Sequence, residues 1–273
     1  MFATAALARR IEAAESTLAA DVTRAVGVRR GPASVYIQAI GGGTAVFAGA
    51  GSPFNKVAGV GFEALDPDTL TAIEEEFGSR GAPVQMEVST LADPAVGEML
   101  TGRGYKLRGF ENVLGLPLDQ RTLAEANAPG IRIDKATDDG TWIDVVATGF
   151  VHPDISDAPA SHESYDREAL EQVFKDTSGV AGFERYLAWR EDAIAGGGAL
   201  RIWNGIAQLS GAATLPDHRR RGVQSALLGH RLAVAARAGC DIAVVTTSPG
   251  SKSQENVQRQ GFFLLYARAV LVK

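Results

Sequence analysis

Cysteine is almost absent from this chain of 273 residues, and its scarcity excludes two kinds of protein. The single cysteine, Cys240, can form no disulfide within the chain, and no cysteine cluster is available to bind a metal. Because disulfides are typical of oxidising compartments, we expect a reducing cytoplasm as the location. The four histidines are too scattered for a zinc pattern, so no metal is predicted.

An excess of basic residues and a long hydrophobic run are also missing. The formal net charge of −5 argues against nucleic-acid binding. No run approaches the roughly 18 apolar residues of a membrane-spanning helix, so no membrane contact is expected. Near the start, Leu7, Ile11, Leu18 and Val22 have the spacing of an amphipathic helix, and early glutamates argue against a signal peptide. We expect this helix to pack on the first domain.

The composition that remains is that of an ordinary globular protein. The chain is 45% hydrophobic and 22% charged, and its length is enough for roughly two domains of average size.

A strand-to-helix junction rich in arginine is the most informative stretch. Residues 206–214 have the pattern of a strand, and residues 223–237 have that of a helix. Between them lie Arg219, Arg220, Arg221 and Gly222. A helix N-terminus presents unpaired N–H groups and a partial positive charge, and glycine lets an anion approach the backbone. The junction therefore predicts a phosphate site; the alternative is a solvated patch of surface arginines.

The string PDHRRRGVQSALL in this junction resembles the cofactor loop of the GNAT superfamily of N-acyltransferases. The family pattern is Arg or Gln, two residues, Gly, one residue, then Gly or Ala, and it lies between the fourth strand and the third helix. Arg219 and Gly222 match, whereas Gln224 replaces the final small residue.

The resemblance covers about residues 131–273. After the loop helix come a buried strand at 242–247, a polar helix that ends before Gly261, and a last strand at 262–272, in the order that closes a GNAT domain. Ser251 or Ser253 is the expected N-cap of the polar helix.

The resemblance implies acetyl-CoA as co-substrate, with its pantetheine arm along the end of the strand and its pyrophosphate in the loop. A backbone N–H near Ala213 is expected to stabilise the oxyanion. Residues on the next helix are expected to contact the thiol end. The implied cofactor-binding residues are Ala212, Ala213, Thr214, Arg219, Arg220, Arg221, Gly222, Val223, Gln224, Ser225, Ser253 and Asn256.

The proton-transfer groups depart from the family. Many relatives carry a tyrosine general acid at the position of Val257 and an asparagine at the position of Gly250. Tyr266 is the nearest tyrosine in sequence and is the candidate catalytic acid, with a half-buried structural aromatic as the other interpretation. No acidic residue is distinguished as the base.

Two pairs of similar segments suggest an internal duplication. The glycine triplet at 41–43 resembles that at 196–198, and both are expected in hairpin turns or bulges. Gly104-Tyr105 and the strand after it correspond to Gly261-Phe262 and its strand at an offset of 157.

We therefore predict an α/β (α+β) fold of two GNAT-like units, each with a mixed, mostly antiparallel sheet flanked by helices. The first unit spans residues 1–119, with a hairpin, a strand at 56–62, a helix at 68–80, a strand at 84–89, a helix at 94–101 and a last strand. A linker at 120–130 leads to the second unit at 131–273. In it we expect a strand at 131–133, a helix from Thr137 or Asp138, and a helix at 164–175. The resemblance implies that the irregular segment at 151–163 and the helix after it shape the acceptor pocket; a role in packing alone is the alternative.

The first unit lacks the arginine loop. Its corresponding residues, 63–68, carry three carboxylates and no arginine, so they repel phosphate. We expect this degenerate unit to act as a scaffold, a wall of the substrate site or a homodimer surface.

The sequence thus predicts an N-acetyltransferase that moves an acetyl group from acetyl-CoA to an amine of a small molecule or protein by direct attack, without metal. Two alternatives stay open: a module that binds acyl-CoA without turnover, and a structural protein with a vestigial site.

Overall fold

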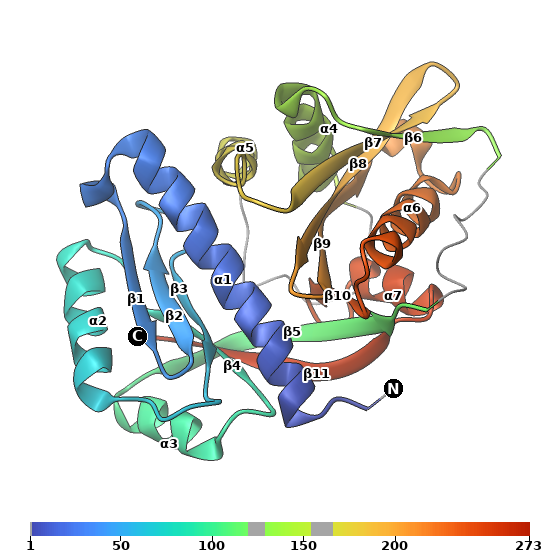
Figure 1. Cartoon of the computed structure of the whole chain (residues 1–273). Helices are drawn as coiled ribbons and strands as arrows, with labels where there is room; N and C mark the ends of the chain where they lie inside the picture. Colours follow the sequence, from blue (N-terminus) through green and yellow to red (C-terminus); the bar gives the residue numbers. More distant parts are fainter. Residues whose placement is uncertain (1, 120–128, 154–165) are drawn as a thin grey trace.

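A computed structural model describes residues 2–119, 129–153 and 166–273. Its eleven strands form one sheet with helices on both faces (Figure 1). The strand order is β1-β2-β3-β4-β11-β5-β10-β9-β8-β7-β6, and only the pairs β3–β4 and β9–β10 are parallel. The predicted class, a mixed and mostly antiparallel sheet flanked by helices, is confirmed. The linker at 120–130 and the segment at 151–163 lie largely outside the described residues, and the division into units at 119 and 131 stays a prediction.

The elements of the first half follow the predicted order. In chain order they are α1 (Ala5–Arg30), β1 (Tyr36–Ile40), β2 (Gly43–Phe47), β3 (Lys56–Val60), α2 (Pro67–Ser79), β4 (Gln85–Ser89), α3 (Pro94–Gly102) and β5 (Lys106–Pro117). Local sequence signals mark the starts of α2 and α3. Pro67 and Pro94 occupy their first turns, and the aspartate before each proline, Asp66 or Asp93, is the N-cap.

The second half begins with β6, α4 and α5 where the first half has α1, and then repeats the order of elements from β1 to β5. Its elements are β6 (Ile131–Lys135), α4 (Asp139–Val151), α5 (Arg167–Asp176), β7 (Phe183–Arg190), β8 (Ala193–Trp203), β9 (Ile206–Thr214), α6 (Val223–Arg237), β10 (Ile242–Thr247), α7 (Lys252–Arg259) and β11 (Phe263–Val272). Asp138 caps α4 and Ser251 caps α7, as the sequence indicated.

The last strands of the two halves are exchanged. β5 ends the first half but pairs with β10 of the second half, while β11 ends the chain but pairs with β4 of the first half. β5 and β11 also pair with each other in an antiparallel ladder (Figure 1). The predicted correspondence at an offset of 157 therefore identifies the two strands that join both halves into one sheet.

Only the first of the two glycine triplets forms a hairpin turn, whereas the second lies at register shifts of β8, which agrees with the bulge that the sequence left as the other possibility. Gly41 and Gly42 form the turn between β1 and β2, with positive φ angles of 54° and 81°. The second triplet lies within β8, whose hairpin with β7 turns five residues earlier. There, side chains from both faces crowd the strand: a Cβ on Gly197 would lie 2.8 Å from Val146, and one on Gly198 would lie 2.9 Å from the Arg231 guanidinium carbon. Close packing, not a turn, requires these glycines.

Alternation of side chains along the strands defines two helical layers. Leu187 and Ala199 pack with α4, whereas their neighbours Ala188 and Leu200 pack with α6 on the opposite face. Helix α1 shares the face of α4, because Arg201, two residues beyond Ala199, donates to the Ala14 carbonyl at 3.1 Å. α2 and α3 cover the other face of the first half.

Helix α1 packs on both halves (Figure 1). The expectation from the sequence, that it packs on the first half alone, is therefore wrong. In the second half it forms ion pairs from Asp21 to Arg201 at 2.7 Å and from Arg10 to Asp241 at 2.9 Å. On the first half, Glu15 lies 3.1 Å from Lys56 of β3. None of the described helices has the length and apolar character needed to cross a bilayer.

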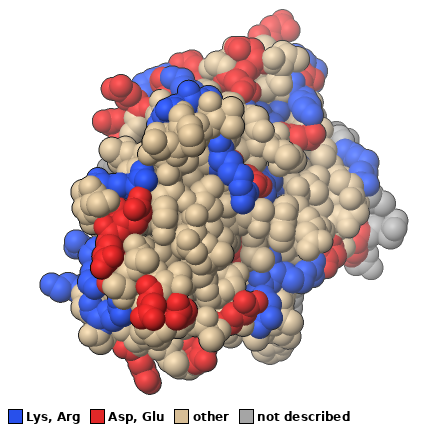
Figure 2. Space-filling view, turned by 60° about the vertical axis from the view of Figure 1, so that its left-hand side comes forward, with Lys and Arg blue, Asp and Glu red and all other residues tan. Residues whose placement is uncertain are grey.

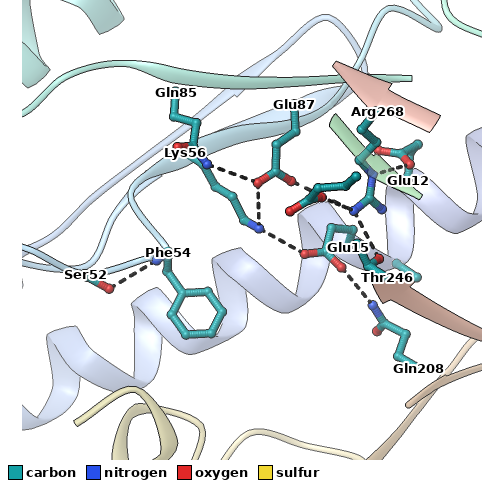
Figure 3. A network of polar contacts seen from close by, with 12 residues as sticks. Glu12, Glu15, Ser52, Phe54, Lys56, Gln85, Glu87, Gln208, Thr246 and Arg268 are labelled. Atoms are coloured by element: carbon teal, nitrogen blue, oxygen red, sulfur yellow. Dashed lines mark hydrogen bonds and ion pairs between the residues drawn. The ribbon is translucent and has the colours of Figure 1, made fainter. Parts of the chain in front are cut away.

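A buried ionic cluster connects α1 to the exchanged strands (Figure 3). Arg268 of β11, 1% exposed, donates to Glu12 of α1 at 2.8 Å and to Glu111 of β5 at 3.3 Å. Glu12, Glu15, Lys56, Glu87, Glu111 and Arg268 together form what we call the α1 cluster. Burial opposes the ionised form of Arg268, but Glu12 and Glu15 nevertheless raise the pKa of its guanidinium well above the ordinary value.

The face of the molecule shown in Figure 2 carries side chains of both charges. On the face shown in Figure 2, acidic and basic side chains alternate around the margin, and a broad central area carries neither. Charges of opposite sign at this spacing largely cancel at distances beyond about 10 Å in ordinary salt.

Arg268→Ala should destabilise the fold strongly. The substitution leaves Glu12 buried without its cation, so we expect a loss of about 3–5 kcal/mol in the free energy of unfolding. Urea unfolding measures this loss. Arg259→Ala is the control, because Arg259 forms an exposed pair with Glu255 on α7 and should cost about 0–1 kcal/mol. Equal losses in the two variants would show that the α1 cluster does not stabilise the fold.

Candidate functional site

Strands β9 and β10 separate from each other at the centre of the second half. Their parallel pairing covers only Ile206 to Gln208 of β9, opposite Ile242 to Val244 of β10. Beyond Gln208 and Val244 the two strands have no register with each other, and Ser210 and Thr246 are exposed on either side of the opening. A splay between parallel strands leaves backbone groups of both strands free for a ligand.

The backbone of β9 directs polar groups into this opening. Leu215 donates to the Ala195 carbonyl at 2.9 Å, and hydrogen-bonded pairs alternate in an antiparallel ladder, so Ala213 also bonds to β8. The Thr214 N–H therefore faces away from β8, and the register shift leaves Gly211 and Ala212 as a bulge. Ala212 and Thr214 are better placed than Ala213, the expected oxyanion donor, to present an N–H to the opening.

Arg231 of α6 fixes the start of that bulge. Its guanidinium is 1% exposed and donates to the carbonyls of Ala199 at 2.9 Å and Ser210 at 3.3 Å. No described carboxylate lies within salt-bridge distance, and burial lowers the pKa of Arg231 to about 10. A cation held against the bulge adds positive potential where an oxyanion would form. No pattern in the sequence indicated a role for Arg231 beyond its place in a helix.

Helix α6 begins with uncapped N–H groups. Its N-cap is Gly222, which has a left-handed φ of 82° and no side chain to accept a hydrogen bond. By contrast, a Thr, Asp or Ser side chain caps each of the other six described α-helices. The first-turn amides of Val223, Gln224 and Ser225 are therefore available to an anion.

The three arginines before Gly222 have different roles. Arg220 and Arg221 are exposed. Arg219 instead turns inward, where it donates to the carbonyls of Thr214 at 3.4 Å, of Gly149 at 3.5 Å, and of His152. Since Gly149 and His152 end α4, Arg219 caps that helix and ties it to the loop.

The corresponding helix start in the first half is closed. Asp66 caps α2 by accepting from the Thr69 N–H at 2.9 Å. Asp66 and Glu63 line a cavity of about 470 Å³ together with the glycines of the β1–β2 turn. The carboxylates occupy the position that phosphate would need, as the sequence predicted from residues 63–68.

Tyr266 lies outside the opening. Its side chain is 4% exposed and its hydroxyl donates to Glu12 at 2.6 Å. Burial and the charge of Glu12 raise the pKa of this hydroxyl. Strand β5 separates Tyr266 from β10, so the expected role as general acid has no support in this geometry.

The remaining predicted residues lie on the helices beside the opening. Ser225, in the first turn of α6, accepts from Gln260 at the end of α7 at 3.3 Å, so the two helix ends are adjacent. Asn256 is half-buried on α7 and Ser253 is exposed. Val257, at the family's tyrosine position, is a core residue that is 5% exposed.

Comparisons with known proteins agree with this geometry. Residues 151–262 match the sequence model of the acetyltransferase (GNAT) family. This protein carries a GNAT-family domain. No curated protein matches the chain significantly. The GNAT match covers α6 with its open N-terminus, β9, β10 and α7.

Solved structures extend the similarity of fold to both halves. A GCN5-related N-acetyltransferase from Kribbella flavida superposes with a TM-score of 0.64 at 16% identity, covering 92% of this chain and 95% of the other. A tandem GNAT protein from the clavulanic acid biosynthesis pathway has a TM-score of 0.62 at 14% identity, covering 92% and 87%. A GCN5-related N-acetyltransferase from Sphaerobacter thermophilus has a TM-score of 0.55 at 16% identity, covering 80% and 71%. The chain therefore has the tandem GNAT fold.

Arg219→Ala should behave differently from the double variant Arg220→Ala/Arg221→Ala. Loss of the α4 cap should cost about 1.5–3 kcal/mol of stability, since these bonds have a charged donor. The exposed arginines should cost about 0–1 kcal/mol. Urea unfolding of the two variants measures the difference. If Arg219→Ala were as stable as the double variant, the contacts of Arg219 with α4 would not contribute to the free energy of unfolding.

Proposed function

We propose that this protein is an N-acetyltransferase that transfers the acetyl group of acetyl-CoA to an amine. The observation that supports this most directly is the uncapped N-terminus of α6 at the end of β9, beside the splay. A pyrophosphate there accepts hydrogen bonds from the amides of Val223 to Ser225, and Arg220 and Arg221 add positive charge.

The pantetheine arm extends from the loop along the open edge of β9. Its amides pair with the backbone of Ala212 and Thr214, which bring the thioester to the splay. A backbone N–H at the bulge polarises the thioester carbonyl, and Arg231 behind it strengthens the positive potential. The amine attacks the carbonyl carbon directly, so no covalent enzyme intermediate forms.

A second candidate is a module that binds acyl-CoA without turnover. Val257 and Tyr266 favour it, because the first cannot donate a proton and the second is buried against Glu12. This reading keeps the binding site and removes the proton donor for the leaving thiolate. The acetyltransferase requires water to protonate the leaving thiolate, whereas the binding module does not.

Acetyl-CoA should stabilise the folded protein. A ligand present at 100 times its dissociation constant adds about 2.7 kcal/mol to the free energy of unfolding, which a thermal shift detects. The double variant Arg220→Ala/Arg221→Ala should need more acetyl-CoA for the same shift, because it loses two charges at the pyrophosphate.

Release of free thiol from acetyl-CoA in the presence of amines then separates the two candidates. A thermal shift with amine-dependent thiol release supports the transferase. A shift without thiol release, over amines, aminoglycosides and peptides, favours the binding module. The absence of any shift at millimolar acetyl-CoA would contradict both candidates.

A further inference from the structure

We propose that Glu111, supplied by the exchanged strand β5, binds the acceptor as an alkylammonium ion and takes its proton at the splay. This inference rests on the proposed acetyltransferase function and names the missing base and the acceptor class. Under this inference the first half, which has no open phosphate site, contributes the Glu111 carboxylate to the active site of the second half.

Glu111 is on β5, next to β10, the strand that forms one edge of the splay. Nη1 of Arg268 donates both to Glu111 Oε2 and to the Thr246 hydroxyl, each at 3.3 Å. Thr246 is exposed on β10, two residues beyond the last pair with β9. The Glu111 carboxylate and the edge of the opening therefore share one guanidinium nitrogen, on the face of the sheet that carries α1 and α4.

The other carboxylates of the α1 cluster are occupied or sealed (Figure 3). Glu15 accepts from Lys56 at 3.1 Å and from Gln208 at 3.4 Å. Although burial opposes ionisation, the charges of Lys56 and Arg268 lower the pKa of Glu15 to about 2, which makes it a poor base. Glu12 and Glu87 are each 1% exposed. Glu111 has one hydrogen bond among the described residues, through Oε2, and its side chain is 14% exposed, so Oε1 remains for an acceptor.

The charge balance behind Glu111 selects a cation. Four carboxylates of the α1 cluster face two cations, Lys56 and Arg268, which gives 2 − 4 = −2 when all are ionised. Burial raises the pKa of Glu12 and Glu87, so part of this charge is neutralised by protons. Glu12 Oε2 and Glu87 Oε2 are also buried without a hydrogen-bond partner in the described structure. An alkylammonium group beside Glu111 complements this negative excess.

The proposed step is balanced in atoms and charge. The alkylammonium nitrogen gives one proton to the Glu111 carboxylate and becomes a neutral amine. Its lone pair forms the N–C bond to the acetyl carbon, and the C–S bond of the thioester breaks. The amine nitrogen loses its second proton as the amide forms, and the thiolate of CoA takes up one proton. The products are the N-acetyl amine, free CoA and one proton released to solvent through Glu111.

Two acceptors test this assignment. Putrescine carries alkylammonium groups near neutral pH, whereas an arylamine such as p-anisidine is neutral there and needs no base before attack. Glu111→Gln should lower kcat/KM for putrescine by about 100-fold or more, the usual contribution of a general base. It should leave kcat/KM for p-anisidine within about threefold, because the cofactor site and the oxyanion donors are unchanged. Glu111→Asp, which keeps the carboxylate, should recover part of the putrescine activity.

Glu98→Gln is the matched control. Glu98 is exposed on α3, on the opposite face of the first half, so this variant removes the same charge far from the splay and should leave both activities unchanged. Thermal unfolding with and without acetyl-CoA reports whether each variant is folded and binds the co-substrate.

Equal losses for both amines in Glu111→Gln, or no loss for either, would overturn the inference and leave the transferase in place. Wild-type protein that acetylates p-anisidine but not putrescine would do the same. Wild-type protein that acetylates neither amine would overturn the inference; the proposed function would fail with it only if no amine, aminoglycoside or peptide released thiol from acetyl-CoA.

Discussion

The ladder between β5 and β11 is the constraint on which the rest of the molecule depends. Each of these strands leaves its own half, and together they occupy the centre of the sheet. The hydrogen bonds between them replace a domain interface with a continuous backbone ladder, and the α1 cluster adds charged contacts on one face. Because of the exchange, the half without an open phosphate site provides a neighbouring strand for β10 and places Glu111 near Thr246 of that strand.

The two halves differ where their helices begin. Asp66 closes the start of α2 with its own carboxylate, whereas Gly222 leaves the start of α6 open. One residue type at one position therefore decides whether a helix dipole is satisfied internally or by a ligand. Arg219 also has a structural role: the sequence analysis predicted it as a phosphate ligand, and in the structure it caps α4. The loop that carries Arg219 therefore connects the expected cofactor site to α4.

Local patterns predicted most elements, because periodicity, proline and capping residues act within a few positions. The strands at 56–60 and 242–247 and the helices begun by Asp138 and Ser251 are of this kind. The partner of each strand was not predictable, since no local signal states that β5 lies beside β10. For the same reason the sequence could not connect Glu111 with Thr246, which lies 135 positions further along the chain. At the glycines of 196–198 the sequence could not separate a turn from a bulge or from close packing against Arg231, because all three favour glycine.

The position of β11 also has a consequence for how the chain folds during synthesis. β11, the strand that completes the first half, follows β4 by more than 170 residues, so one edge of β4 stays unpaired until those residues have been made. Pairing across so long a separation has a high entropic cost and forms late. An exposed strand edge is a site for association with other chains, so the nascent protein is prone to aggregation until β11 has been made and has paired with β4.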